Sequence, residues 1–272
     1  MDNKHNVRSI DRALDLLLAL EQTGRPMRLT ELAQTTGIHK ATSQRLLSVL
    51  ERRGLVEKDS TLYHLGPATV PLAYAFFQGN NLSKAILPFL QELATTTEET
   101  VSLFVRLGFS RVAIQRVEGK HPMRYVLPVG QRLPLYLGAG KVLAAAMPEE
   151  ELNAMLNQIG EIRTAIGEKW TRETFLDKLR LIREQGYDIS FNERTIGGVS
   201  VTAPILRAEK NVVEAITIAG STENITPERI PALTVEVRRA AQAIGEMYAS
   251  SGRICGVRTH SAKVDRSSEK TE

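Results

Sequence analysis

Apolar positions in the first 65 residues recur at helical spacing in three stretches, which glycines separate. The stretches cover residues 9–23, 30–36 and 39–53, and leucines or alanines form an apolar face in each. Two short β-compatible runs follow on either side of Asp59-Ser60, which favours a hairpin. Three helices and a hairpin in this order predict a winged helix-turn-helix.

The hydrophobic pattern changes at Gly66-Pro67, where the regular runs stop. An apolar helical stretch over residues 68–77, followed by polar residues to Asn81, indicates a linker helix. Beyond it, helical stretches mix with runs of β-branched residues, which is typical of an α+β domain. We expect helices over residues 82–95, 139–147, 148–157, 171–185 and within 226–248, and strands over residues 100–106, 111–117, 187–191, 199–206 and 212–218.

These patterns divide the chain into four parts. We predict a winged helix-turn-helix domain at residues 1–66, a linker helix at 67–81, an α+β domain at 82–250 and a disordered tail at 251–272. The tail is assigned because it lacks apolar periodicity. The predicted fold class is therefore α+β, with a small N-terminal domain and a larger C-terminal one.

The overall composition is that of an ordinary globular protein, with 42% hydrophobic and 24% charged residues among 272. No stretch approaches the roughly 20 apolar residues of a membrane-spanning helix, so we expect no membrane association. The single cysteine, Cys255, cannot form an internal disulfide or a cysteine-based metal cluster. Both observations favour a cytoplasmic protein.

The formal net charge of +4 is distributed unevenly along the chain. Residues 1–65 carry 10 Lys and Arg against 8 Asp and Glu, residues 66–251 carry 20 against 20, and residues 252–272 carry 5 against 3. The excess positive charge therefore lies at the two ends. Because so small an excess is as typical of a solvated surface as of nucleic-acid binding, the local pattern has to decide.

The third predicted helix places basic and polar side chains opposite its apolar face. Between residues 39 and 53 it has four basic residues and one acid, Glu51. Arg45 can pair with guanine and Gln44 with adenine, while hydroxyls and lysines can reach bases or phosphates. The candidate DNA contacts are Lys40, Thr42, Ser43, Gln44, Arg45, Ser48 and Arg52, with Lys58 and His64 from the hairpin. A winged helix that contacts proteins instead of DNA is the alternative.

Motifs along most of the chain, from Val7 to Tyr248, resemble the IclR family of bacterial transcription regulators. In the N-terminal domain they are Arg8-Ser-Ile-Asp-Arg-Ala-Leu-Asp-Leu-Leu, Leu29-Thr-Glu-Leu-Ala and Tyr63-His-Leu-Gly-Pro. In the C-terminal domain they are Arg132-Leu-Pro-Leu-Tyr, Gly140-Lys-Val-Leu-Ala-Ala and Ile182-Arg-Glu-Gln-Gly-Tyr. The resemblance implies a C-terminal GAF-like effector-binding domain, a double-stranded DNA operator and a homodimer or homotetramer.

The resemblance also implies which residues surround the effector. Carried over by position, they are Met123, Leu133, Gly138, Ala139, Gly140, Ser190, Ser200, Thr217 and Ala219. Gly138-Ala139-Gly140 precedes a predicted helix, where unpaired N–H groups and the helix dipole favour an anion. Because Ser190 stands in place of an Asp, the pocket has one negative charge fewer, and we expect a small organic acid as the effector.

Several positions depart from the family pattern. Thr202, Leu206 and Arg207 replace a smaller residue, an aromatic residue and an Asp or Asn, and the loop between Pro134 and Lys141 is one residue shorter. Ser43 replaces an apolar residue in the third helix. The identity of the effector is therefore not carried over from the family.

Motifs of enzymes fail at specific positions. The segment from Leu135 to Lys141 lacks the third glycine of a dinucleotide site, because Leu143 takes its place, and lacks the hydroxyl residue of a phosphate loop. Ser200 is not in a nucleophile elbow, and residues 122–259 contain no histidine. An acid pair, Asp188 and Glu193, remains conceivable, but we expect both side chains on the surface. We predict no catalytic residues, no metal site and no cofactor.

The sequence thus predicts a sequence-specific DNA-binding transcription regulator, acting as a repressor or an activator and controlled by a small-molecule effector. The alternative is a small-molecule-binding enzyme or sensor whose accessory winged helix makes protein contacts. Steep salt dependence of duplex binding would distinguish the two, because phosphate neutralisation releases counterions.

Overall fold

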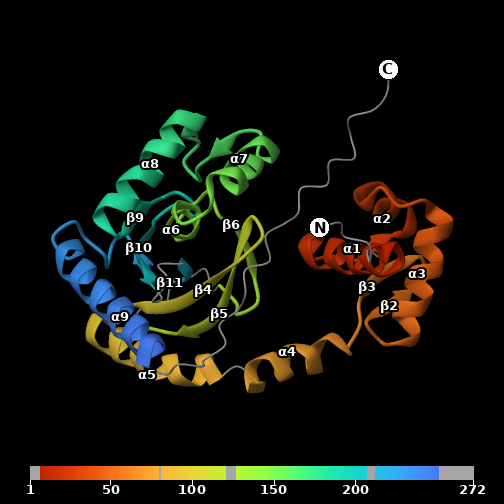
Figure 1. The fold of residues 1–272 in the computed structure, drawn as a ribbon, viewed down its shortest axis with the longest axis horizontal. Helices are drawn as coiled ribbons and strands as arrows, with labels where there is room; N and C mark the ends of the chain where they lie inside the picture. The colour runs from red at the N-terminus through yellow and green to blue at the C-terminus, as the bar shows by residue number, and fades with distance from the viewer. Residues whose placement is uncertain (1–6, 80, 121–126, 207–211, 251–272) are drawn as a thin grey trace. The chain divides into compact units, whose positions relative to one another are not determined.

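The computed structural model describes residues 7–79, 81–120, 127–206 and 212–250. The chain folds into two compact units, residues 1–80 and 81–272 (Figure 1). The predicted tail lies outside the described residues. Each unit has its own hydrophobic core, so each is described by itself.

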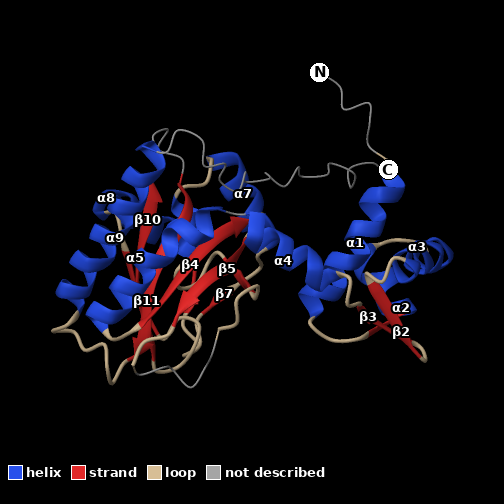
Figure 2. Ribbon diagram, turned by 90° about the horizontal axis from the view of Figure 1, so that it is seen from below, coloured by secondary structure: helices blue, strands red, loops and turns tan. Residues whose placement is uncertain are grey.

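The first unit is a winged helix-turn-helix, as the sequence predicts. Its helices are α1 (Arg8–Thr23), α2 (Leu29–Thr36) and α3 (Lys40–Arg52), and its strands are β1 (Met27–Arg28), β2 (Val56–Asp59) and β3 (Leu62–Leu65). The strands pair antiparallel in the order β1-β3-β2, and β2 and β3 form the wing (Figure 2). Leu16, Leu32 and Leu47, one from each helix, are fully buried in the core between them.

Two glycines fix the path of the chain in this unit. Gly24 ends α1 with a φ of 63°, a left-handed conformation that glycine adopts without strain. After the wing the chain passes the end of α3 so closely that a Cβ on Gly66 would collide with the carbonyl of Gly54. The last helix of the unit, α4, covers Thr69–Gly79.

The second unit is an α+β domain built around a six-stranded antiparallel sheet of order β6-β5-β4-β11-β10-β9. Its strands are β4 (Thr100–Leu107), β5 (Ser110–Val117), β6 (Arg132–Pro134), β9 (Asp188–Phe191), β10 (Gly198–Leu206) and β11 (Val212–Ser221), and β7 (Ile162–Arg163) pairs separately with β8 (Lys169–Trp170). Its helices are α5 (Asn81–Thr97), α6 (Gly140–Ala145), α7 (Glu149–Gln158), α8 (Arg172–Gln185) and α9 (Ile230–Ser250). None of the helices described in either unit is long and apolar enough to cross a membrane.

Helices cover both faces of the six-stranded sheet (Figure 1). On one face α5 and α9 pack over a core that includes Val101, Val201 and Ile216. On the other face α6 and α8 pack over a second core that includes Leu143 and Phe175. Because side chains alternate between the faces of a strand, the strand residues next to Val101, Val201 and Ile216 point to the opposite face, on which α6 packs.

Candidate DNA-binding surface and ligand pocket

α3 exposes one face of basic and polar side chains. Lys40, Gln44, Arg45, Ser48 and Arg52 are exposed on it, and Thr42 is half-buried. The opposite face buries Leu47 and Leu50 in the core of the unit. Since residues three and four apart share a helix face, the exposed residues form one continuous surface. The structure thus brings together all the candidate contacts of this helix except one.

Ser43 is the exception, because its side chain is completely buried. Its hydroxyl donates to the carbonyl of Ile38 at 3.2 Å and to that of His39 at 3.3 Å. The prediction that Ser43 contacts DNA is therefore wrong, since the side chain ties the start of α3 to the preceding turn. The sequence already carried the signal, because Ser43 takes the place of an apolar residue.

The two candidate contacts of the wing lie on its paired strands. Lys58 on β2 is exposed, and its Nζ lies 5.5 Å from the centre of the Tyr63 ring. His64 on β3 is half-buried, with Nδ1 3.2 Å from the Leu65 carbonyl oxygen and Nε2 4.0 Å from a carboxylate oxygen of Glu57. Lys58 is therefore the more accessible of the two for a phosphate.

The second unit contains a cavity over the sheet face on which α6 packs. Seven predicted effector residues line it: Leu133, Gly138, Ala139, Ser190, Ser200, Thr217 and Ala219. Further lining residues that the sequence did not indicate include Ser102, Phe104, Arg111, Arg116, Arg194 and Thr195. The cavity volume is about 80 Å³, and since a buried water needs roughly 10–15 Å³, the space fits a small ligand.

Strand register explains why these residues meet. Two rows of directly opposed residues cross the sheet: Ser190, Ser200, Ala219 and Thr100 in one, and Thr217, Ser102 and Arg116 in the other. Residues opposed in neighbouring strands point to the same face. Side chains from strands far apart in the sequence therefore form a common floor, in which small hydroxyl groups predominate.

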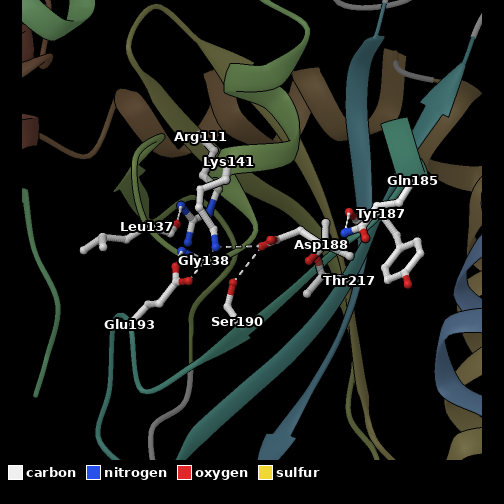
Figure 3. Close-up of polar contacts among 11 residues, drawn as sticks. Arg111, Leu137, Gly138, Lys141, Gln185, Tyr187, Asp188, Ser190, Glu193 and Thr217 are labelled. Atoms are coloured by element: carbon white, nitrogen blue, oxygen red, sulfur yellow. Dashed lines mark hydrogen bonds and ion pairs between the residues drawn. The ribbon is translucent and has the colours of Figure 1, made fainter. Parts of the chain in front are cut away.

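A buried ion cluster lies beside the cavity (Figure 3). Lys141, which is 1% exposed, has its Nζ 3.1 Å from Asp188 Oδ2 and 2.5 Å from Glu193 Oε1. The hydroxyl of Ser190 donates to the same Asp188 oxygen at 2.8 Å. The expectation of surface positions for Asp188 and Glu193 is therefore wrong, because the buried ammonium group compensates both carboxylates inside the domain.

Most of the N–H groups at the start of α6, where the sequence predicted an anion, are occupied inside the domain. The N–H of Gly138 donates to Glu193 Oε2 at 2.7 Å. The N–H of Gly140 donates to the Leu137 carbonyl at 3.3 Å, and that of Lys141 to the Gly138 carbonyl at 3.1 Å. Since internal acceptors occupy these three donors, side chains supply most of the hydrogen-bond donors for an anion in the cavity.

Gly140, which was predicted to contact the effector, does not line the cavity, and its neighbours leave no room for a side chain. A Cβ at this position would collide with the guanidinium of Arg111 and with the backbone of Leu135. Arg111 is 2% exposed, and its Nη1 donates to the carbonyls of Pro134 and Leu137. The glycine therefore allows the segment before α6 to close over a buried arginine.

The positions that depart from the family pattern lie mainly outside the cavity lining. Thr202 is fully buried, and its hydroxyl lies 3.1 Å from that of Thr217. Leu206 is exposed at the end of β10. Arg207 lies outside the described residues, as does Met123, which was predicted to contact the effector.

A winged helix-turn-helix with an exposed basic face, followed by a domain with a polar cavity, defines a DNA-binding regulator that responds to a small molecule. Family comparisons agree with this class. Residues 9–60 match the IclR helix-turn-helix domain, and residues 75–246 match the C-terminal domain of the bacterial transcriptional regulator IclR. The chain belongs to the IclR family of transcription regulators.

Individual relatives support the same assignment over most of the chain. The HTH-type transcriptional regulator KipR of Bacillus subtilis is 30% identical over 218 residues, covering 79% of this chain and 87% of KipR. The transcriptional repressor IclR of Escherichia coli is 28% identical over 253 residues, covering 89% and 90%. A crystal structure of an IclR transcriptional regulator from Alicyclobacillus acidocaldarius superposes with a TM-score of 0.73 at 26% identity, covering 90% of this chain and all of that one.

These findings confirm the predicted family, the α+β fold class and the function of a transcription regulator with an effector-binding C-terminal domain. The relatives are regulators and repressors, so the protein is a regulator and not an enzyme. The alternative of an enzyme with an accessory winged helix is thereby set aside.

Proposed function

We propose that this protein is a cytoplasmic transcriptional repressor that binds a double-stranded operator as a homodimer or larger homo-oligomer. A small organic acid in the cavity of the second unit alters its affinity for DNA. Repression is inferred from relatives such as IclR of Escherichia coli, which is named a repressor. The observation that carries the choice of effector is the excess of positive charge around the cavity.

The charges in and beside the cavity do not cancel. The cations are Arg111, Arg116, Arg194 and Lys141, and the carboxylates are Asp188, Glu193 and the exposed Glu118, which leaves a formal charge of +1. Burial, reinforced by Arg194, lowers the pKa of Arg111 to about 9. The protein therefore disfavours this buried charge, and an anion in the cavity would stabilise it.

Recognition of DNA is assigned to the exposed face of α3 and to the wing. Arg45 and Gln44 are the candidates for base contacts, because their side chains can bond to two atoms of guanine and adenine respectively. Lys40, Arg52 and Lys58 are exposed and suit phosphate contacts. Basic residues on both α3 and the wing are consistent with a helix that enters a groove of the DNA while the wing lies beside the phosphate backbone.

Exposed apolar side chains on α1 and α4 support self-assembly. On and just before α1, Val7, Ile10, Leu14 and Leu18 recur at three- and four-residue spacing and are about half exposed. α4 buries none of its residues and exposes Val70, Leu72, Tyr74 and Phe76. Exposed apolar side chains gathered in this way mark protein contacts. A second copy of the chain is the partner that a two-fold symmetric operator requires.

The proposal is tested with the full chain and duplex DNA selected from a random-sequence library. Fluorescence anisotropy should show binding that weakens steeply with salt, because phosphate contacts release counterions. Addition of short organic acids should then shift the affinity for the selected duplex. Failure to enrich any duplex at low salt would contradict DNA recognition, whereas enrichment without any effect of the acids would contradict only the proposed effector.

A further inference from the structure

The strand β5 contains a bulge beside the cavity. Arg116 pairs with Ser102 on β4, but Phe104, two residues further along β4, pairs with Ala113. Ile114 is thus an additional residue in β5, and its side chain is buried in the core under α5 and α9. Bulges of this kind redirect side chains next to functional sites.

The bulge changes which face two arginines occupy. In a regular strand, residues five apart point to opposite faces of the sheet, because side chains alternate. In β5, Arg111 and Arg116 nevertheless both line the cavity. A second guanidinium group is therefore added to a face that would otherwise have only one from this strand.

The charge of Arg116 is buried and weakly compensated. Its side chain is 10% exposed, and Nη1 makes one long hydrogen bond, 3.4 Å, to the Leu127 carbonyl. Nε lies 3.9 Å from the carboxylate of Glu118, which is exposed, and has no hydrogen-bond partner among the residues that the structure describes. A buried guanidinium with an unused N–H is a site that an anion satisfies.

The other cations in and beside the cavity are occupied to different extents. Lys141 is held by two carboxylates. Nη1 of Arg111 donates to two backbone carbonyls, although its Nε, like that of Arg116, has no partner among the described residues. Arg194 is half-exposed, so solvent screens its charge. Arg116, whose Nη1 makes one long hydrogen bond where that of Arg111 makes two, is therefore the less fully hydrogen-bonded arginine and the one better able to donate to a ligand carboxylate.

Hydroxyl groups of the cavity floor define the rest of the ligand. Ser102 is directly opposite Arg116, and Ser200 lies in the adjoining row, three strands away from Arg116 in the sheet. Within the described part of the chain, neither hydroxyl has a hydrogen bond to another side chain or to the backbone. Both can therefore bond to an oxygen of the ligand, while Phe104, Leu127 and Leu133 provide an apolar wall.

We propose that Arg116 selects for a carboxylate in this cavity and that the ligand is a hydroxy- or oxo-carboxylate. The carboxylate binds the guanidinium of Arg116, and the second oxygen binds Ser102 or Ser200. This assignment rests on the proposed function, since it specifies the ligand chemistry of the same cavity. It adds a specificity residue and a structural reason, the bulge, for its presence there.

The test is calorimetric titration of the full chain with lactate, pyruvate, malate, gluconate and propionate, and with the uncharged lactamide. We expect a hydroxy- or oxo-acid to bind more tightly than propionate, and lactamide not to bind. Arg116→Gln should raise the Kd of the bound acid by about 30-fold or more, because it removes one partner of a buried charge pair. Arg116→Lys should have a smaller effect, since it keeps the charge but loses the fork of donors.

Arg163→Gln is the matched control, because Arg163 is exposed on β7, does not line the cavity and pairs with Glu161. An acid that binds Arg116→Gln as tightly as the unmodified chain would overturn the role of Arg116 and leave the acid effector standing. An unmodified chain that binds none of the acids would overturn the acid effector itself. If circular dichroism shows that Arg116→Gln is unfolded, Ser102→Ala and Arg116→Lys provide the test instead. The proposal fails if Ser102→Ala still binds the hydroxy- or oxo-acid more tightly than propionate and Arg116→Lys binds it as tightly as the unmodified chain.

Discussion

Lys141 carries its charge inside the domain, where Asp188 and Glu193 compensate it. Lys141→Met would leave two buried carboxylates without a cation, and breaking a buried pair in this way costs about 3–5 kcal/mol. We expect the free energy of unfolding to fall by this amount in urea denaturation at neutral pH. Lys169→Met, which removes an exposed lysine paired with Glu161, should change it little. Equal losses in the two variants would contradict a structural role for the ion cluster.

Arg45 and Ser43 are two residues apart on α3 but face opposite environments, since Arg45 is exposed and Ser43 is buried. Arg45→Ala should weaken binding to the selected duplex by about 1–3 kcal/mol if the side chain reads a base. Ser43→Ala should leave sequence preference unchanged and lower only stability, because its hydroxyl bonds within the fold. Anisotropy titrations of both variants check this, and unaltered binding by Arg45→Ala would exclude it as a contact.

How far single site residues could be predicted depended on what they face. Seven cavity residues were found because the family resemblance carried them over by position. Glu193 and Lys141 were missed as a pair because periodicity shows that a residue is polar but not what lies opposite it. Arg116 was missed because the bulge at Ile114 breaks the alternation by which a strand face is read.

At the scale of elements, the start of α2 depends on one carboxylate. Glu31 Oε2 accepts the backbone N–H of Arg28 at 2.7 Å, and Oε1 accepts a guanidinium N–H of Arg25 at 2.8 Å. These interactions, the backbone bond first, lower the pKa of Glu31. The folded domain therefore favours the ionised form, and α2 begins with an occupied N–H group.

This carboxylate predicts a pH dependence of stability. Since the folded pKa of Glu31 is below the unfolded one, its contribution is present at neutral pH and is lost as the pH falls below about 4.3 through the folded pKa. Glu31→Gln should lower the urea midpoint at neutral pH, and the difference from the unmodified chain should shrink in acid. Glu51→Gln, an exposed change on α3, is the control. A difference that persists in acid would contradict the assignment.

Elements with several turns of periodicity were predicted closely, as α3 shows: residues 39–53 were expected and Lys40–Arg52 form the helix. The strands β1, β6, β7 and β8 were not predicted, because two or three residues carry no readable alternation. Their pairing depends on partners elsewhere in the fold, such as β3 for β1. Short elements of this kind follow from tertiary structure and not from local preference.

At the scale of the whole molecule, the exposed apolar side chains of α1 and α4 predict an assembly. Leu14→Glu and Tyr74→Glu place charges among these side chains and should shift the mass measured by light scattering toward the monomer. Duplex affinity should fall with it, because two half-sites are then no longer bound together. Ile166→Glu, an exposed change in the second unit, should alter neither property. A monomeric unmodified chain would contradict the prediction.

The bulge in β5 also bears on how such a regulator can change its ligand. Deleting Ile114 would place Arg111 and Arg116 four residues apart, a spacing at which a regular strand keeps both on one face. A one-residue insertion or deletion elsewhere between them, with the bulge kept, would instead turn one of the two arginines away from the cavity. Ligand charge preference in this domain can thus diverge through a one-residue insertion or deletion, an evolutionary step that comparison of aligned substitutions overlooks.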